Sequence, residues 1–176
     1  DSHELGQTDL ISTMMKVKIR EARLEDAKAI HETLNEALRP LAITGYPETA
    51  IEAAIVKPWM IRDRIMSGST VLVAEIEGKV VGTVGGIRES RAMKVVSLAV
   101  RPSHQRKGIG CRLLLKLESI AMRLRCQKLF LFTAWPMIEA IRLYLSLGYR
   151  KEGYLRRHFY GEDMAIFSKY LFKDGD

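Results

Sequence analysis

The sequence predicts an α/β fold of the α+β kind, in which a mixed central sheet of about seven strands carries helices on both faces. The first observation is the order strand, glycine-bearing loop, helix over residues 95–115, where a buried apolar strand leads directly into a helix. The second is a hairpin between two strand-like runs, 70–76 and 79–87. The third is a closing pair of strand-like runs at 149–159 and 164–171.

The N-terminal elements follow from periodicity. Residues 1–13 are polar and without period, so we expect a disordered lead or an extension foreign to the natural chain, followed by one domain over 14–174. Alternating apolar and basic residues over 16–20 are typical of a half-buried strand. Apolar residues at helical spacing predict a helix over 24–38, which Pro40 closes.

The segment 41–69 carries the weakest pattern. A turn is expected at 45–47, and residues 48–66 predict one or two helices that break near Pro58. In the strand that follows the next hairpin turn, Gly82, Gly85 and Gly86 indicate a bulge or a close approach by another backbone or ligand.

The second half of the chain alternates strands and helices. A turn over 88–92 leads into the strand that opens the 95–115 segment, and the helix from Gly108 is expected to run to about Arg125. The apolar run 128–133 predicts a strand buried on both faces. Pro136 suits the first turn of the next helix, which Gly148 ends.

Composition and charge narrow the possible partners. The net charge is +7, with 28 Lys plus Arg against 21 Asp plus Glu, which suits a polyanionic ligand. No basic run is dense enough to favour nucleic acid, and no apolar run is long enough for a membrane span, so we expect neither partner. Cys111 and Cys126 lie about four turns apart along one helix and are not expected to pair, which favours a reducing, cytoplasmic setting.

The motif Q-x-x-G-x-G, formed by Gln105, Gly108 and Gly110, stands where the helix begins. The first N–H groups of a helix lack partners and carry partial positive charge, and glycine lets an anion approach the main chain. Arg106 and Lys107 add mobile positive charge, which suits a ligand with several phosphates. Taken alone, a glycine pattern this short is more typical of an ordinary helix start.

With its flanks the motif is far more specific. The run V-x-P-x-x-Q-R-K-G-I-G-x-x-L-L resembles the acetyl-coenzyme A signature of the GNAT-superfamily N-acetyltransferases, and the resemblance spans about residues 17–171. It implies that loop amides hold the coenzyme A pyrophosphate, that the preceding strand bonds the pantetheine arm, and that no metal is needed. The coenzyme-binding residues that it implies are Leu98, Ala99, Val100, Gln105, Arg106, Lys107, Gly108, Ile109, Gly110, Cys111 and Met137. Family members often have Asn where this chain has Met137, so one polar contact to the coenzyme arm would be missing.

A second run, 140–149, is similar to the A-x-x-L-Y-x-x-x-G-[FY] segment of the same family. The tyrosine of that segment usually lies near the thioester sulfur and acts as general acid, which implies this role for Tyr144. Acetyl transfer needs such a residue because the departing thiolate must be protonated. Without this context, a helical tyrosine among leucines would be interpreted as a core residue.

The closing strands, L-R-R-H-F-Y-G-E-D-M-A-I-F, look like the ending of the protein N-terminal acetyltransferases, including the ribosomal-protein alanine type. This resemblance implies that His158 or Tyr160 lines the acceptor site. The glutamate that serves as base in the ribosomal type falls at Phe132, so no base is assigned by transfer. The titratable residues expected near the site are His104, Glu75 and Glu89, and a water chain could replace any of them.

Further acceptor contacts are expected from the weakly determined segment, because in the resembled family this region walls the acceptor pocket. The candidates are Tyr46, Glu48, Glu52 and Trp59. The alternative is that both aromatics simply pack in the core, and for Trp59 we favour that interpretation.

These observations together predict an enzyme, a monomer or a homodimer, that transfers acetyl from acetyl-coenzyme A to a primary amine. Direct attack on the thioester is expected, with a peptide or protein N-terminus as the leading acceptor. One alternative is a small amine such as a polyamine, which a pocket rich in Glu and Asp would favour. The other is a non-catalytic coenzyme A-binding sensor or interaction module on the same fold.

Overall fold

The computed structural model describes residue 12 and residues 16–172. The expectation of a disordered lead over 1–13 therefore falls, apart from Ser12, outside the described residues. No helix in this described part of the chain is long and apolar enough to span a membrane.

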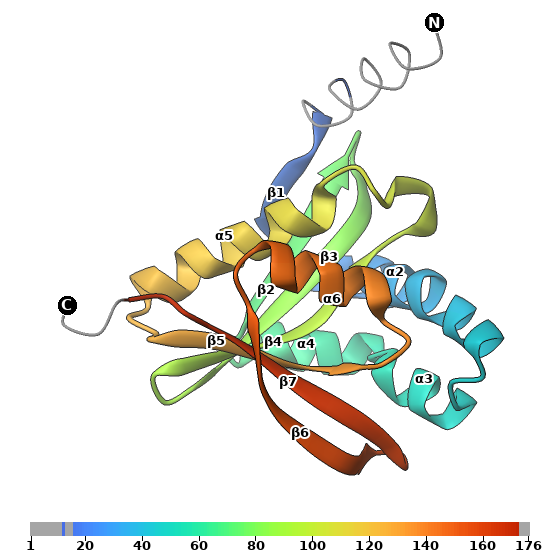
Figure 1. Cartoon of the computed structure of the whole chain (residues 1–176). Helices are drawn as coiled ribbons and strands as arrows, with labels where there is room; N and C mark the ends of the chain where they lie inside the picture. Colours follow the sequence, from blue (N-terminus) through green and yellow to red (C-terminus); the bar gives the residue numbers. More distant parts are fainter. Residues whose placement is uncertain (1–11, 13–15, 173–176) are drawn as a thin grey trace, which may run out of the picture.

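One mixed sheet of seven strands runs through the described residues in the order β1-β2-β3-β4-β5-β7-β6 (Figure 1). The first four strands form an antiparallel meander, β5 joins β4 in parallel, and β7 and β6 complete the sheet in antiparallel pairing. The strands are β1 (Lys18–Glu21), β2 (Thr70–Ile76), β3 (Lys79–Glu89), β4 (Ala92–Val100), β5 (Lys128–Ala134), β6 (Arg150–Phe159) and β7 (Glu162–Tyr170). The predicted seven-stranded mixed sheet is confirmed.

Helices cover both faces of this sheet, as predicted (Figure 1). They are α2 (Ala27–Leu38), α3 (Glu48–Ala54), α4 (Pro58–Met66), α5 (Ile109–Arg123) and α6 (Ile138–Ser146), with short 3-10 helices at Leu24–Asp26, Arg39–Thr44 and Pro102–His104. One apolar core lies under α5 and α6, where Leu113 and Leu117 are fully buried. A second lies under α2, α3 and α4, where Ile30, Ile51 and Ile61 are buried. The two apolar faces of the sheet are therefore each sealed by amphipathic helices.

Some boundaries differ from the sequence prediction. The chain stays helical past Pro40 as a 3-10 turn, because proline is tolerated in the first turn of a helix, where its missing N–H has no partner anyway. The turn expected over 88–92 shrinks to residues 90–91, since Glu89 already pairs with Ala92. Residues 48–66 form two helices, of which the second begins at Pro58.

A bulge interrupts β4 against β3. The register of the two strands shifts between Thr83 and Gly85, and Ser97 of β4 has a φ of 54°, in the left-handed region. The expected close approach of another backbone is present at Gly82 and Gly85, where a Cβ would lie 3.3 and 3.4 Å from carbonyl oxygens of β4. At Gly86 the close neighbour is a side chain, since a Cβ would lie 2.6 Å from the sulfur of Met93. The bulge falls in the part of β4 that no longer pairs with β5.

The parallel pair β4–β5 is short. Pairing runs only from Ala92 with Lys128 to Lys94 with Phe130, although both strands continue for several residues. Beyond Lys94, no strand of the described chain pairs with the edge of β4 that faces β5. The sheet is therefore split between these two strands, with open main-chain groups along the split.

Candidate active site

A pocket of about 340 Å³ opens at this split. Its walls come from β4 and β5, from α2, α3 and α4 on one face, from α6 on the other, and from the β6–β7 hairpin. Most of the lining is apolar, and its polar side chains are Tyr46, Arg64, Lys94, Ser97, Thr133, Tyr144 and His158. An apolar pocket with a few polar groups is typical of a ligand site.

The loop before α5 presents a row of main-chain donors. Gly108, with φ 76°, precedes the helix, and Arg106 also has a positive φ of 61°. Within the described residues, the backbone N–H groups of 106–111 have no hydrogen-bond acceptor. The side-chain amide of Gln105 does not point to a ligand, because its Nε2 donates to the carbonyl of Val100 at 2.9 Å. This hydrogen bond holds the loop against the end of β4. Free amides at the start of a long helix fit a pyrophosphate.

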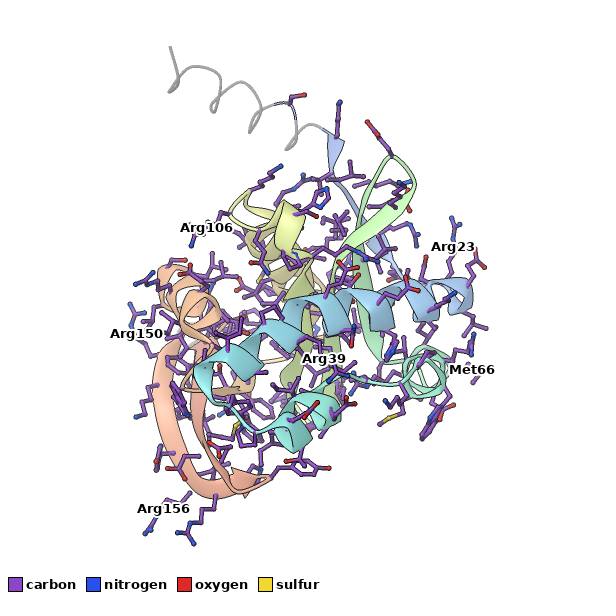
Figure 2. All side chains as sticks on the ribbon, turned by 90° about the vertical axis from the view of Figure 1, so that its right-hand side faces the viewer. Arg23, Arg39, Met66, Arg106, Arg150 and Arg156 are labelled. Atoms are coloured by element: carbon purple, nitrogen blue, oxygen red, sulfur yellow. The ribbon has the colours of Figure 1, made fainter. Side chains whose placement is uncertain are left out.

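Side chains around this loop have different surroundings. Arg106 is exposed on the loop before α5, as Figure 2 shows, Lys107 and Cys111 are half-buried, and Ile109 is buried in the core. A Cβ on Gly110 would lie 3.3 Å from Cδ2 of Leu143. Gly110 therefore allows α5 to begin close against α6, in addition to leaving its amide accessible.

The strand before the loop has an exposed main chain. Leu98 lines the pocket, Ala99 is buried on the α2 face, and Val100 packs against the core under α5. Ala99 and Val100 pair with β3 on one side only. The open edge of β4 can therefore bond an extended, amide-containing ligand as a further strand would.

Tyr144 projects from α6 into the pocket. Its ring lies against Tyr149 and Phe167, with centroids 5.8 and 6.5 Å away, and 6% of the residue is exposed. Burial raises the pKa of Tyr144, so its hydroxyl keeps its proton at neutral pH. No described residue forms a hydrogen bond with that hydroxyl. Thr133, whose buried Oγ1 also lacks a partner in the described chain, and Met137 line the same pocket.

The structure separates the acceptor candidates. Tyr46 and His158 line the pocket, whereas the others lie outside it. Glu48 and Glu52 form ion pairs with Arg39 on the surface. The remaining candidates are exposed aromatics, Tyr160 at 61% and Trp59 at 62%, so Trp59 is not a core residue.

The three candidate bases also lie outside the pocket lining. Glu75 is 2.7 Å from Arg20 in a partly buried ion pair, and Glu89 lies at the exposed end of β3. His104 sits in the 3-10 turn before the loop, where burial and the charges of Lys107 and Arg101 lower its pKa.

Several lining residues were missed from the sequence. Arg64, in the last turn of α4, donates from Nη1 to the hydroxyl of Ser97 at 3.0 Å. Lys94 places its Nζ 4.6 Å from the centre of the Phe132 ring, and the ring of His158 meets Phe132 edge-on at 5.6 Å. Strand alternation beside buried Met93 and Val95 could have placed Lys94 on the pocket face, but Arg64 has no comparable signal.

The expectation that residues 128–133 are buried on both faces is wrong. Leu129 and Leu131 are buried, whereas Phe130 and Phe132 are half-buried, and Phe132 lines the pocket. Phe130 and Phe132 point to the same face of β5, which is therefore only partly covered.

Comparisons with known proteins agree with this geometry. Residues 28–149 match the family model of the acetyltransferase (GNAT) family. An uncharacterized N-acetyltransferase of Methanocaldococcus jannaschii is 30% identical over 153 residues, which cover 86% of this chain and 90% of that protein.

Two solved structures share the fold. The ribosomal-protein-S18-alanine N-acetyltransferase from Escherichia coli has a TM-score of 0.74 at 20% identity, over 91% of this chain and 97% of that chain. The PaiA N-acetyltransferase from Thermoplasma acidophilum, in complex with coenzyme A, has a TM-score of 0.75 at 21% identity, over 88% and 98%.

The family match covers well over half of the chain, and the resemblance expected from the sequence is confirmed. The free amides before α5 and the open edge of β4 fit coenzyme A, and among the described residues no group of three or more His, Cys, Asp or Glu is placed to hold a metal. The chain therefore belongs to the GNAT family and is an N-acetyltransferase that uses acetyl-coenzyme A as acetyl donor.

Proposed function

We propose that this enzyme acetylates a primary amine by direct attack, with Tyr144 as general acid and a peptide or protein N-terminus as the leading acceptor. Acetyl-coenzyme A supplies an activated thioester. The observation that carries the proposal is the hydroxyl of Tyr144, which is protonated, unpartnered among the described residues, and at the wall of a pocket that opens beside the exposed edge of β4.

In this mechanism the chain holds the donor mainly through its backbone. The amides between Gln105 and Gly110 bind the pyrophosphate, and the open edge of β4 at Leu98 and Val100 bonds the pantetheine arm. The amine nitrogen attacks the thioester carbonyl carbon, and the carbon–sulfur bond then breaks. Tyr144 gives its proton to the departing thiolate, which offsets the charge that develops there.

The amine must lose a proton to attack, and the pocket favours the neutral amine. Two cationic side chains, Lys94 and Arg64, line the pocket. Their positive charge lowers the pKa of a nearby ammonium group. The proton that is released on amide formation passes to His158 or to water.

The charges also favour an N-terminus over a polyamine. No Asp or Glu is among the residues that line the pocket, although a polycation needs carboxylates to replace its hydration. An uncharged α-amine at the end of a peptide needs no such partner.

An acceptor screen tests the proposal. The enzyme is incubated with acetyl-coenzyme A and with peptides that have a free N-terminus, the same peptides blocked at the N-terminus, polyamines or aminoglycosides, and products are identified by mass spectrometry. We expect one acetyl group on the free peptides and none on the blocked ones. Acetylation confined to polyamines would contradict the acceptor, and thioester hydrolysis with no acetylated amine would contradict the enzymatic role.

A further inference from the structure

We infer that the acceptor carries a carboxylate close to its reactive amine, and that Arg64 binds this carboxylate with help from Lys94. The inference rests on the proposed function and adds the chemical class of the acceptor. The evidence is the guanidinium of Arg64 at the wall of the pocket, with which no carboxylate of the described residues pairs.

Arg64 differs from Arg20 and Arg101, which are also partly buried. The guanidinium of Arg20 is 2.7 Å from both Asp26 and Glu75, and that of Arg101 pairs with glutamates of α2. Arg64 is half-buried, yet no carboxylate in the described part of the chain pairs with it. Burial lowers the pKa of Arg64, and no neighbouring acid offsets this effect. A partly buried guanidinium without a carboxylate loses hydration that no ion pair replaces, so an anionic partner from outside the chain would stabilise it.

The hydrogen-bonding capacity of Arg64 is largely unused. A guanidinium offers five N–H donors in a fixed fork, and among the described residues only the hydroxyl of Ser97 accepts from it, at 3.0 Å. A carboxylate accepts two parallel hydrogen bonds from such a fork, which makes the pair strong and directional. Ser97 is the bulged residue of β4, so this fork lies beside the split in the sheet.

The other cationic side chain that lines the pocket is Lys94, so the pocket carries positive charge on both β4 and α4. Lys94 lies on β4 three residues before Ser97 and lines the pocket, with its ammonium group over the ring of Phe132. His158 contacts the same ring from β6. Because no acidic side chain lines the pocket, the site as a whole complements a negative group.

The phosphates of coenzyme A are a poor match for Arg64. Figure 2 shows Met66, two residues after Arg64 on α4, on the other side of the molecule from Arg106, which marks the loop with the free amides. A pocket of about 340 Å³ holds one amino-acid residue beside the acetyl group rather than a long chain. The carboxylate therefore belongs to the residue that carries the amine, either as the acidic side chain of a first Asp or Glu, or as a carboxylate of a free amino acid.

Matched acceptors and variants test this inference. The value of kcat/KM is measured for peptides that begin with Asp, Asn, Glu or Gln and are otherwise identical, and for free aspartate. The variants are Arg64→Met, Arg64→Lys and the control Arg62→Met, which removes one exposed charge from the same helix. Thermal unfolding of each variant shows whether the fold is kept.

We expect the parent enzyme to prefer acidic acceptors over their amides by about tenfold or more, the range of one charged hydrogen-bonded pair. Arg64→Met should abolish this preference, with a larger loss of kcat/KM for the acidic acceptors than for their amides, Arg64→Lys should restore part of it, and Arg62→Met should keep it. If the Asp peptide has the higher kcat/KM, the carboxylate comes from the side chain of a first residue, and if free aspartate has the higher kcat/KM, it comes from a free amino acid. An equal loss for acid and amide acceptors in Arg64→Met would show a purely structural role and overturn the inference.

Binding separates this inference from the proposed function. Calorimetry with the enzyme–coenzyme A complex should show tighter binding of the Asp peptide than of the Asn peptide, and Arg64→Met should remove the difference. If the parent acetylates N-termini with no preference for acidic ones, the inference fails and the proposed function stands. If no amine is acetylated, the proposed function fails, and equal binding of the two peptides then overturns the inference as well. Should Arg64→Met unfold, Lys94→Met is measured in the same way and is expected to weaken the same preference.

Discussion

The two sides of the split sheet build their sites in different ways. The proposed coenzyme side consists of main-chain groups within one continuous stretch, from the open edge of β4 to the first turn of α5. The proposed acceptor side consists of side chains from α3, α4, β4, β5 and β6, which lie far apart in the sequence. A backbone site of the first kind tolerates changes in most side chains, whereas a site of the second kind changes its specificity with single substitutions. We therefore expect different effects of substitutions on the two sides and at Tyr144, which lies between them.

The largest effect is expected at Tyr144, where the two sides meet. Tyr144→Phe keeps the ring packing and removes the hydroxyl that would protonate the thiolate, so kcat should fall on the order of 10²-fold with coenzyme affinity unchanged. Steady-state kinetics with an identified amine and calorimetry with acetyl-coenzyme A measure the two quantities. Tyr149→Phe is the matched control, because this buried tyrosine lies outside the pocket lining. Turnover at the parent rate in folded Tyr144→Phe would remove the general-acid assignment.

A smaller effect is expected when the backbone of the coenzyme side is changed. Gly108→Val places a branched side chain at a φ of 76° beside the free amides. Affinity for acetyl-coenzyme A should fall by at least about tenfold, or about 1.4 kcal/mol, in calorimetry. Gly78→Val has the same kind of backbone, with φ 78° in the distant β2–β3 turn, and measures the cost to folding alone. An unchanged affinity in a folded Gly108→Val protein would show that the pyrophosphate is bound elsewhere.

The smallest effect is expected from a side chain on the coenzyme side. Arg106→Ala removes an exposed charge, so coenzyme affinity should fall less than in Gly108→Val, and the difference should shrink as salt is added. Arg125→Ala is the matched control, since Arg125 is exposed, also has a positive φ, and lies just beyond the other end of α5. A loss in Arg106→Ala larger than that in Gly108→Val would contradict the view of this side as a backbone site.

The same contrast explains which features the sequence predicted. The coenzyme loop was recognisable because strand, glycines and helix are consecutive, and the fold followed because each strand run has its own local pattern. The structure puts Tyr144 at the pocket, as its motif suggested, but the role of the hydroxyl stays a prediction. Arg64 carries no local signal that distinguishes it from other surface cations, and the alternation of β4 places Lys94 only on one face of the strand, because the pocket forms only when distant elements pack together. Glu75 was selected for its type, yet it is used in an ion pair with Arg20.

The short pairing of β4 with β5 also bears on how firmly the chain stays folded. Among the described residues, the ladder that joins the meander β1–β4 to the β5–β7 part of the sheet has three residue pairs, so a ligand that lies along the open edge would supply the contacts that a continuous ladder would otherwise make. A ligand that binds the native state alone adds about 2.7 kcal/mol to the free energy of unfolding at a concentration one hundred times its Kd. Resistance to local opening and to proteolysis would then rise and fall with the supply of acetyl-coenzyme A, and this would link the lifetime of the folded enzyme to the acetyl donor that it consumes.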